Sequence, residues 1–403
     1  MTRSTARWRA VVATSVVAAA AFGACTATDP SGAAGTTGTS TATAAQTGPR
    51  LTWEPVALPS GLEPRTLTTM GDSLLVGALT SGDTPENPSP AMLTIDAAGT
   101  QASVPLNPQS PYASLARWYS VATDGPRIIA IGGANGGAHA NVRWTTWSGT
   151  LAGVDELPQS FYAFGGWGAG ELVDAVITPG GNALVGSWGG AKAGLDAAVW
   201  TFANPVWTRQ DPAGTALEST STLLVGPRGA TRDGEGLLVT GSALHLDQGV
   251  NQTAAVWRSS AVNTGWHRID LPDVGTHSES VSARCDTAAA HGVCVVAGQV
   301  DGRLAVWALD GDAATRQNGI PTLAVGDQDV VPAPVAAGST TVLVSPNGGT
   351  AALLSRSGEA SWAVSAGPDG LPVAAALVGN RLYVATRPKA GAAATLFTAP
   401  WPG

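Results

Sequence analysis

Short runs of apolar, β-favouring residues recur along the chain, and most of them end in glycine. Seven copies are spaced by 55, 54, 55, 57, 47 and 41 residues, measured between the glycines or the residues in their place. A second apolar run follows, and in four copies it ends in tryptophan 9 to 16 residues after the glycine. The first runs end at Gly77, Gly132, Gly186, Gly241, Gly298, Ser345 and Thr386, and the tryptophans are Trp144, Trp200, Trp257 and Trp307. This pattern predicts a repeated unit of several strands.

A repeat of this length that holds several short strands is typical of a β-propeller blade. We therefore predict an all-β, seven-bladed β-propeller over residues 51–403. Turn residues are frequent and helical periodicity is scarce, which agrees with an all-β domain. The last two units keep the pattern less clearly, so both seven and eight blades stay open at this point.

The start of the domain holds a strand-like segment, Leu51 to Pro59, that precedes every blade core. It shares its construction with Trp266 to Pro272, since both run from a tryptophan to a Leu-Pro pair. The last unit, Val373 to Gly403, lacks a strand of this kind. We predict that Leu51 to Pro59 supplies the outermost strand of the seventh blade, which closes the ring without an unpaired junction.

The repeated tryptophans and glycines have a structural explanation. Side chains that recur at one place in each blade suit packing between neighbouring sheets, so Trp144, Trp200, Trp257 and Trp307 are assigned to the core. The glycine that ends each first run either turns the strand sharply or lets two backbones approach closely. Neither set indicates a ligand.

The first 24 residues form a predicted lipoprotein signal peptide. Arginines precede an apolar segment, Val11 to Ala21, that is too short for a stable membrane span. Phe22-Gly23-Ala24-Cys25 resembles the lipobox of bacterial lipoproteins, although Phe22 stands where leucine is usual, and the resemblance implies lipidation of Cys25. The alternative is an ordinary secretory signal with an incidental cysteine.

Residues 25–50 would then be the lipidated cysteine and a disordered tether rich in Thr, Ala and Gly. The lipid on Cys25 would anchor the exported protein to the outer face of the cytoplasmic membrane. Lipobox, tether and Ala/Gly-rich composition together resemble the exported envelope lipoproteins of high-GC actinobacteria. We expect a monomer.

The net charge and the cysteines restrict the classes of partner and ligand that we expect. The formal net charge is −8 with no basic cluster beyond the N-terminus, which argues against nucleic acid. Cys285 and Cys294 flank a predicted hairpin turn, and in an exported protein this favours a structural disulfide. A metal pair is the alternative, with His291 as the nearby histidine. We predict no metal and no cofactor.

Aromatic residues gather between positions 112 and 164, in or beside two predicted blade connections. In propellers such connections share one face with the loops that join second and third strands, and flat rings there can stack on sugars or anchor a partner protein. The alternative is that these rings fill the gap between blades 2 and 3. The candidate binding residues are Tyr112, Arg117, Trp118, Tyr119, Phe161, Tyr162, Trp167, Trp188 and His245.

Further polar residues are expected on the same face. A pair of histidine and carboxylate among them would suit acid–base chemistry or a cation site, but no spacing singles one out. Solvated surface residues are the simpler interpretation, and we name no catalytic residue. The set is His139, Lys192, Asp196, Asp247, His277 and Glu279.

The repeat resembles seven-bladed propellers in general, without the WD40 Trp-Asp pairs, kelch diglycines or sialidase Ser-x-Asp-x-Gly-x-Thr-Trp boxes. We therefore retain three hypotheses for the function, in this order of preference. The first is a cell-surface lipoprotein whose propeller face binds an envelope glycan or protein. The second is a protein-assembly scaffold without a small ligand. The third is a sialidase-like or other glycan-active hydrolase or lyase that uses two of Asp196, Asp247 and Glu279.

Overall fold

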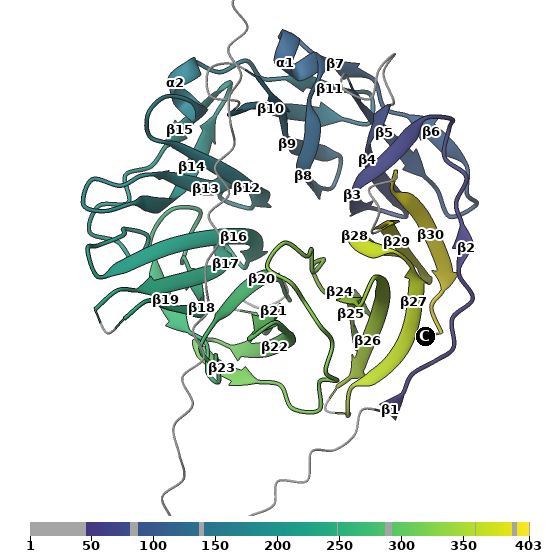
Figure 1. Cartoon of the computed structure of the whole chain (residues 1–403). Helices are drawn as coiled ribbons and strands as arrows, with labels where there is room; N and C mark the ends of the chain where they lie inside the picture. The colour runs from purple at the N-terminus through teal and green to yellow at the C-terminus, as the bar shows by residue number, and fades with distance from the viewer. Residues whose placement is uncertain are drawn as a thin grey trace, which may run out of the picture. The chain divides into compact units, whose positions relative to one another are not determined.

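Seven antiparallel sheets, each with a core of three or four strands from consecutive sequence, surround a central opening in the computed structural model (Figure 1). The structure describes residues 46–80, 88–136, 141–247, 249–286, 292–358, 360–388 and 393–402. Strands make up 61% of the chain and helices 2%. The predicted seven-bladed β-propeller is confirmed, and the count is seven.

Each blade runs from an innermost strand at the opening to an outermost strand at the rim (Figure 1). Blade 1 holds β3 (Leu62–Met70), β4 (Ser73–Thr80), β5 (Ser89–Ile95) and β6 (Gln101–Ser103). Blade 2 holds β8 (Arg117–Asp124), β9 (Arg127–Asn135), β10 (Val142–Thr150) and β11 (Gly153–Glu156), with β7 (Leu106–Asn107) parallel to β11. Blade 3 holds β12 (Ala169–Thr178), β13 (Gly181–Gly189), β14 (Leu195–Ala203) and β15 (Val206–Arg209).

The second half of the ring follows the same order. Blade 4 holds β16 (Leu223–Asp233), β17 (Gly236–His245), β18 (Asn251–Arg258) and β19 (His267–Asp270). Blade 5 holds β20 (Ser278–Cys285), β21 (Cys294–Val300), β22 (Arg303–Asp310) and β23 (Ala313–Arg316). Blade 6 holds β24 (Val335–Ala337), β25 (Thr340–Asn347), β26 (Thr350–Ser357) and β27 (Ala363–Asp369). Blade 7 holds β28 (Leu371–Val378), β29 (Arg381–Arg387) and β30 (Thr395–Pro400).

The N-terminal segment closes the ring, as predicted. β2 (Glu54–Pro55) pairs antiparallel with β30 and is the outermost strand of blade 7. β1 (Gln46–Thr47), from the segment that the sequence assigns to the tether, pairs in parallel with β27 of blade 6. Between them, the indole N–H of Trp53 donates to the carbonyl oxygen of Ala366 at 3.1 Å. The segment therefore holds the last two blades together.

The signal peptide, Cys25 and most of the predicted tether lie outside the described residues. Within residues 46–402, apart from the gaps given above, no helix is long and apolar enough to cross a membrane. Lipidation and anchoring therefore stay predictions.

The repeated glycines lie in the middle of their strands, not at the ends, so the predicted loops begin later than expected. β13 continues three residues past Gly186, and β17 continues four residues past Gly241. A Cβ on Gly186, Gly241 or Gly298 would lie 2.1, 2.0 and 2.1 Å from a carbonyl oxygen of the innermost strand. Close approach of two backbones is thus the role of these glycines.

A β-bulge in the innermost strand lies next to each repeated glycine. In blades 1 to 5 the register between first and second strand shifts by one residue next to the repeated glycine, and blade 7 has the same shift next to Thr386. A bulge adds one residue to a strand and bends it. The added residues are Arg65, Tyr119, Val173, Arg228, Val281 and Val373.

Buried tryptophans pack between neighbouring blades, with one correction to the predicted set. Trp200, Trp257 and Trp307 are at most 1% exposed. The equivalent residue in blade 2 is Trp147, also fully buried, because it lies two residues after the partner of Gly132, as Trp200 lies two residues after the partner of Gly186. Trp144 lies three residues earlier and is only half-buried, so it is free for another role.

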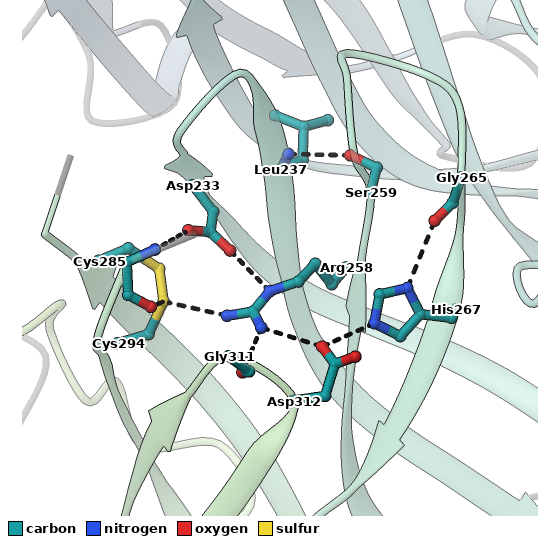
Figure 2. Close-up of polar contacts among 11 residues, drawn as sticks. Asp233, Leu237, Arg258, Ser259, Gly265, His267, Cys285, Cys294, Gly311 and Asp312 are labelled. Atoms are coloured by element: carbon teal, nitrogen blue, oxygen red, sulfur yellow. Dashed lines mark hydrogen bonds and ion pairs between the residues drawn. A yellow bond between two sulfur atoms is a disulfide. The ribbon is translucent and has the colours of Figure 1, made fainter. Parts of the chain in front are cut away.

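Arg258 of blade 4, buried in an ion pair, contacts blade 5 next to the disulfide of that blade (Figure 2). Cys285 and Cys294 are bonded across β20 and β21, as predicted. The Arg258 guanidinium, 2% exposed, lies 2.7 Å from the carboxylate of Asp233 and 3.1 Å from that of Asp312. Asp233 and the two sulfurs lie within 4.8 Å of one another. Since the sulfurs are bonded together and the carboxylate is paired, this trio is not a free set of metal ligands.

We expect Gly241→Ala to lower the free energy of unfolding by about 1–3 kcal/mol, because the new methyl group would force the bulge away from β17. The matched control is Gly153→Ala, in β11, where an added Cβ has no atom within 4 Å. The control should change stability by about 0.5 kcal/mol or less. Denaturant unfolding measures both variants, and equal effects would contradict this role of the glycine.

Deletion of residues 51–59 should unfold the ring, since it removes β2 and leaves the edge of β30 unpaired. Deletion of residues 26–45 should leave the thermal midpoint unchanged. Circular dichroism melts of the two variants test the closure. A cooperative melt near the parent midpoint for the first deletion would refute it.

Replacing Arg258 with Met should destabilise the protein by about 3–5 kcal/mol, because Asp233 would stay buried without its partner. The double variant Asp233→Asn with Arg258→Met should recover much of that loss, since neither side chain is then charged. Urea unfolding of the two variants compares them. A double variant no more stable than the single one would show that the loss comes from packing, not from an unpaired charge.

Candidate functional site

Two short helices stand in the connections on either side of blade 2. α1 (Pro111–Ser114) joins blades 1 and 2, and α2 (Phe161–Phe164) joins blades 2 and 3. Ser110 caps α1, since its hydroxyl accepts the N–H of Ala113 at 3.1 Å and Pro111 occupies the first turn. Both helices lie at the outer rim in Figure 1, α1 near β7 and β11 and α2 near β15.

A cavity of about 340 Å³ is lined by both helices and by β10. We call it the blade 2 groove. Its volume is at the lower end of the range for small-ligand sites. The lining residues are Ser110, Tyr112, Val142, Arg143, Trp144, Thr145, Thr146, Glu156, Leu157, Pro158, Gln159, Ser160, Phe161, Phe164 and Gly165.

A carboxylate fixes the α1 side of the groove. Glu156, at the end of β11, is 5% exposed. Its Oε2 accepts the N–H groups of Gln109 at 2.5 Å and Ser110 at 2.7 Å, and its Oε1 accepts the Ser110 hydroxyl at 2.7 Å. Because these donors satisfy both oxygens, Glu156 positions the helix and offers little charge to a ligand.

The groove presents ring faces and one cation. Tyr112 and Phe161 are 38% and 52% exposed. Trp144 is held by a hydrogen bond of 3.3 Å from its indole N–H to the carbonyl oxygen of Gly170. The Arg143 guanidinium lies 4.9 Å from the centre of the Phe161 ring, a cation–π contact. Among the predicted binding residues, Tyr112 and Phe161 are thus brought together in one cavity.

Two other predicted residues on or next to α2 are exposed but do not line the groove. Tyr162 is 79% exposed, and Trp167 is fully exposed on a segment of glycines. Their rings project to solvent on the same connection between blades 2 and 3. Their exposure leaves both rings available to a partner.

Trp118 is a wrong prediction. It is 4% exposed, donates its indole N–H to the carbonyl oxygen of Ala91 at 2.9 Å, and packs edge-on against Trp147 with ring centres 5.3 Å apart. It lies opposite Gly132, and its side chain fills space between blades 1 and 2. Trp118 therefore belongs to the core.

Trp188 has a mixed position. It is half-buried at the end of β13, packs edge-on against Trp200, and carries the guanidinium of Arg209 4.8 Å above its ring. A Cβ on Gly168 would lie 2.5 Å from its indole nitrogen, so the connection from α2 passes directly over it. Trp188 thus packs mainly within blade 3 and beneath this connection.

Tyr119 and Arg117 lie on the innermost strand of blade 2. Tyr119, the bulge residue, is 44% exposed and meets Trp144 edge-on with ring centres 4.8 Å apart. Burial raises the pKa of the Tyr119 phenol; Arg117 opposes the shift and Glu171 adds to it. Arg117 is exposed at the start of β8. The Tyr119–Trp144 contact links this part of the strand to the blade 2 groove.

His245 and most of the other polar residues lie on blades 3 to 5. His245 is half-buried on β17, with Nε2 3.1 Å from the hydroxyl of Thr253. Asp196 is 4% exposed and accepts the N–H of Ser219 at 2.7 Å. Lys192 is paired with Glu218 at 2.9 Å. These residues do not join the groove of blade 2, and His139 lies outside the described residues.

A separate charge cluster stands at the start of β20. Arg228 lies 3.1 Å from Glu279, and His277 lies 3.4 Å from Asp327. Burial raises the pKa of the Glu279 carboxyl, against the effect of Arg228. The cluster pairs two predicted polar residues with two that sequence reasoning did not select. Each charge has an opposite one, which is the arrangement of a structural network.

Sequence reasoning missed Arg143 and the second role of Trp144. Trp144 was assigned to the core because it ends an apolar run, as Trp200 and Trp257 do. Counting from the residue opposite the repeated glycine would have selected Trp147 instead. No local pattern marks Arg143, whose position over Phe161 depends on how α2 folds back.

The fold is similar to those of several solved structures. The β-propeller domain of the Trilobed protease from Pyrococcus furiosus has a TM-score of 0.50 and 8% identity, over 85% of this chain and 96% of that one. The polysaccharide lyase Uly1 has a TM-score of 0.50 and 8% identity, over 84% and 90%. A Trypanosoma rangeli sialidase has a TM-score of 0.45 and 12% identity, over 89% of this chain but 60% of the sialidase.

At these identities the similarities show the fold alone. Glycan-active enzymes, a sialidase and a polysaccharide lyase, are thus among the structural neighbours of this propeller. No protein-family model matches the sequence, and no curated protein sequence matches it.

Proposed function

We propose that the protein binds a polysaccharide of the cell envelope in the blade 2 groove. The observation that carries the proposal is the placement of three aromatic rings, Tyr112, Trp144 and Phe161, around one cavity of about 340 Å³. Aromatic faces pack well on the apolar faces of sugars, and polar groups beside them fix orientation. Arg143 and Gln159 are such groups in the lining.

The groove has features of a binding site more than of core packing. Tyr112 and Phe161 remain substantially exposed although both stand on short helices that could turn them inward. The helices themselves are fixed, α1 by Glu156 and α2 by the hydrogen bond from the Trp200 indole to Ala163 at 2.9 Å. Rigid elements that hold exposed rings lower the entropic cost of binding. A lipid on Cys25 would hold this site near envelope polymers.

The enzyme hypothesis lacks a comparable observation. Its three candidate carboxylates, Asp196, Asp247 and Glu279, come from blades 3, 4 and 5. Asp196 accepts a peptide N–H, and Glu279 is paired with Arg228. The fold likeness to a polysaccharide lyase agrees with glycan recognition but supplies no residue for a reaction. The scaffold hypothesis would use the exposed Tyr162 and Trp167, which do not line the blade 2 groove.

The test is binding of the purified protein to a panel of envelope polysaccharides, with the double variant Tyr112→Ala and Phe161→Ala. Loss of two stacked rings, at about 0.5–1.5 kcal/mol each, should weaken binding about tenfold or more. Tyr162→Ala is the matched control, because Tyr162 is more exposed, lies on the same helix and does not line the groove.

If the double variant still binds the polysaccharide and the Tyr162→Ala control does not, the site lies at Tyr162. That result would overturn the assignment to the groove. Absence of binding to every polysaccharide, with a protein partner recovered from the same envelope, would favour the scaffold function instead.

A further inference from the structure

Three arginines on blades 2 and 3 of this acidic protein have no hydrogen-bond or ion-pair partner among the described residues. The chain has 29 acidic and 21 basic residues. Nevertheless Arg117, Arg143 and Arg209 make no hydrogen bond or ion pair with any residue in the described ranges. Arg143 lines the blade 2 groove, and Arg117 lies on the same blade.

The nearby carboxylates form no ion pair with these cations among the described residues, and main-chain and hydroxyl donors already bond to the carboxylate oxygens. Glu156 accepts from Gln109 and Ser110, and Asp196 accepts the N–H of Ser219. Asp174 accepts the hydroxyl of Ser120 and the N–H groups of Ala175 and Ala230.

Glu171 is the exception among these carboxylates. It is exposed at the start of β12, and its charge acts on Tyr119. Among the described residues Glu171 makes no ion pair with Arg117 or Arg143, so both guanidinium groups can still pair with an anionic ligand.

From these observations we infer that the polysaccharide bound in the groove is anionic, and that Arg143 and Arg117 bind its carboxylate, sulfate or phosphate groups. The inference rests on the proposed function and narrows it to one class of ligand. It is drawn from the arginines that lack partners, not from the rings that line the cavity.

Arg143 is arranged to bind an oxyanion. The Phe161 ring lies against its guanidinium at 4.9 Å from the ring centre. Stacking on one face leaves the edge donors of a guanidinium available, and these form two parallel hydrogen bonds to a carboxylate, sulfate or phosphate. Removal of the positive charge therefore costs more with an anionic saccharide than with a neutral one.

The position of Arg117 favours a polymer over a small anion. Arg117 pairs with Gly133 on β9, and Gly133 pairs with Trp144 on β10, so the three residues form one row across blade 2. Two strand spacings separate the ends of the row, which is about 10 Å between backbones. Arg143 is the neighbour of Trp144 on β10. An extended saccharide chain can span this separation and contact both arginines.

The experiment compares matched pairs of polymers with the purified protein. The pairs are polygalacturonate with its carboxyl-reduced form, and dextran sulfate with dextran. The acidic member of at least one pair should bind about tenfold or more tightly than its neutral partner. The preferred pair tells carboxylate from sulfate recognition. Affinity should fall as salt rises from about 50 to 200 mM, because ion pairs at an exposed site are screened.

Arg143→Gln and Arg117→Gln should each weaken binding of the acidic polymer about tenfold, and weaken binding of a neutral polymer by a clearly smaller factor. Arg127→Gln is the matched control, since Arg127 is already paired with Asp124 at the turn between β8 and β9. Equal affinity for acidic and neutral members, or equal losses in Arg143→Gln and Arg127→Gln, would overturn the inference.

Failure of this inference differs from failure of the proposed function. Neutral polysaccharides that bind in the groove, and that are lost in the Tyr112/Phe161 double variant, would keep the proposed function and refute anionic recognition. No binding to any polymer of either charge, here or in the envelope panel, would refute both.

Discussion

The absence of a side chain at five repeated positions is the constraint on which this propeller depends. At Gly186, Gly241 and Gly298 the facing carbonyl oxygen takes the place that a Cβ would need. That close approach accommodates a bulge in the innermost strand of the blade. The bulge inserts one additional residue into the strand, and in three blades it is polar: Arg65, Tyr119 and Arg228. One local packing rule thus shapes the ring and supplies the polar side chains of its innermost strands.

Contacts between blades then convert separate sheets into a ring. Buried indoles at equivalent positions fill the space between sheets, and Trp147, Trp200, Trp257 and Trp307 are each at most 1% exposed. Arg258, paired with Asp233 inside blade 4, adds a charged contact to Asp312 of blade 5 next to the disulfide. Pairing of the N-terminal β2 with β30 joins the ends of the chain. Since these contacts use the regular strands, they leave the connections free to vary.

The candidate site lies in that irregular part. α1 and α2 interrupt an otherwise all-β ring on both sides of blade 2, and each displaces aromatic side chains from the sheets to the surface. Aromatic rings line the cavity there, and Arg143 and Arg117 form no ion pair with a carboxylate in the described ranges. A site built from connections on a rigid scaffold is the usual way in which one fold carries different functions.

The sequence by itself determined the blades, the closure by the N-terminal strand and the disulfide, because each depends on a local pattern: a repeated apolar run, a shared Trp-to-Leu-Pro segment, or two cysteines across a turn. Only the tertiary structure decided which aromatic residues are exposed. Both faces of a blade pack against neighbouring blades, so alternation along a strand does not tell a buried ring from a free one. Trp118 was therefore mistaken for a surface residue and Trp144 for a core residue. Arg143 acquires its position only when α2 folds over β10, a contact between segments that no spacing in the sequence records.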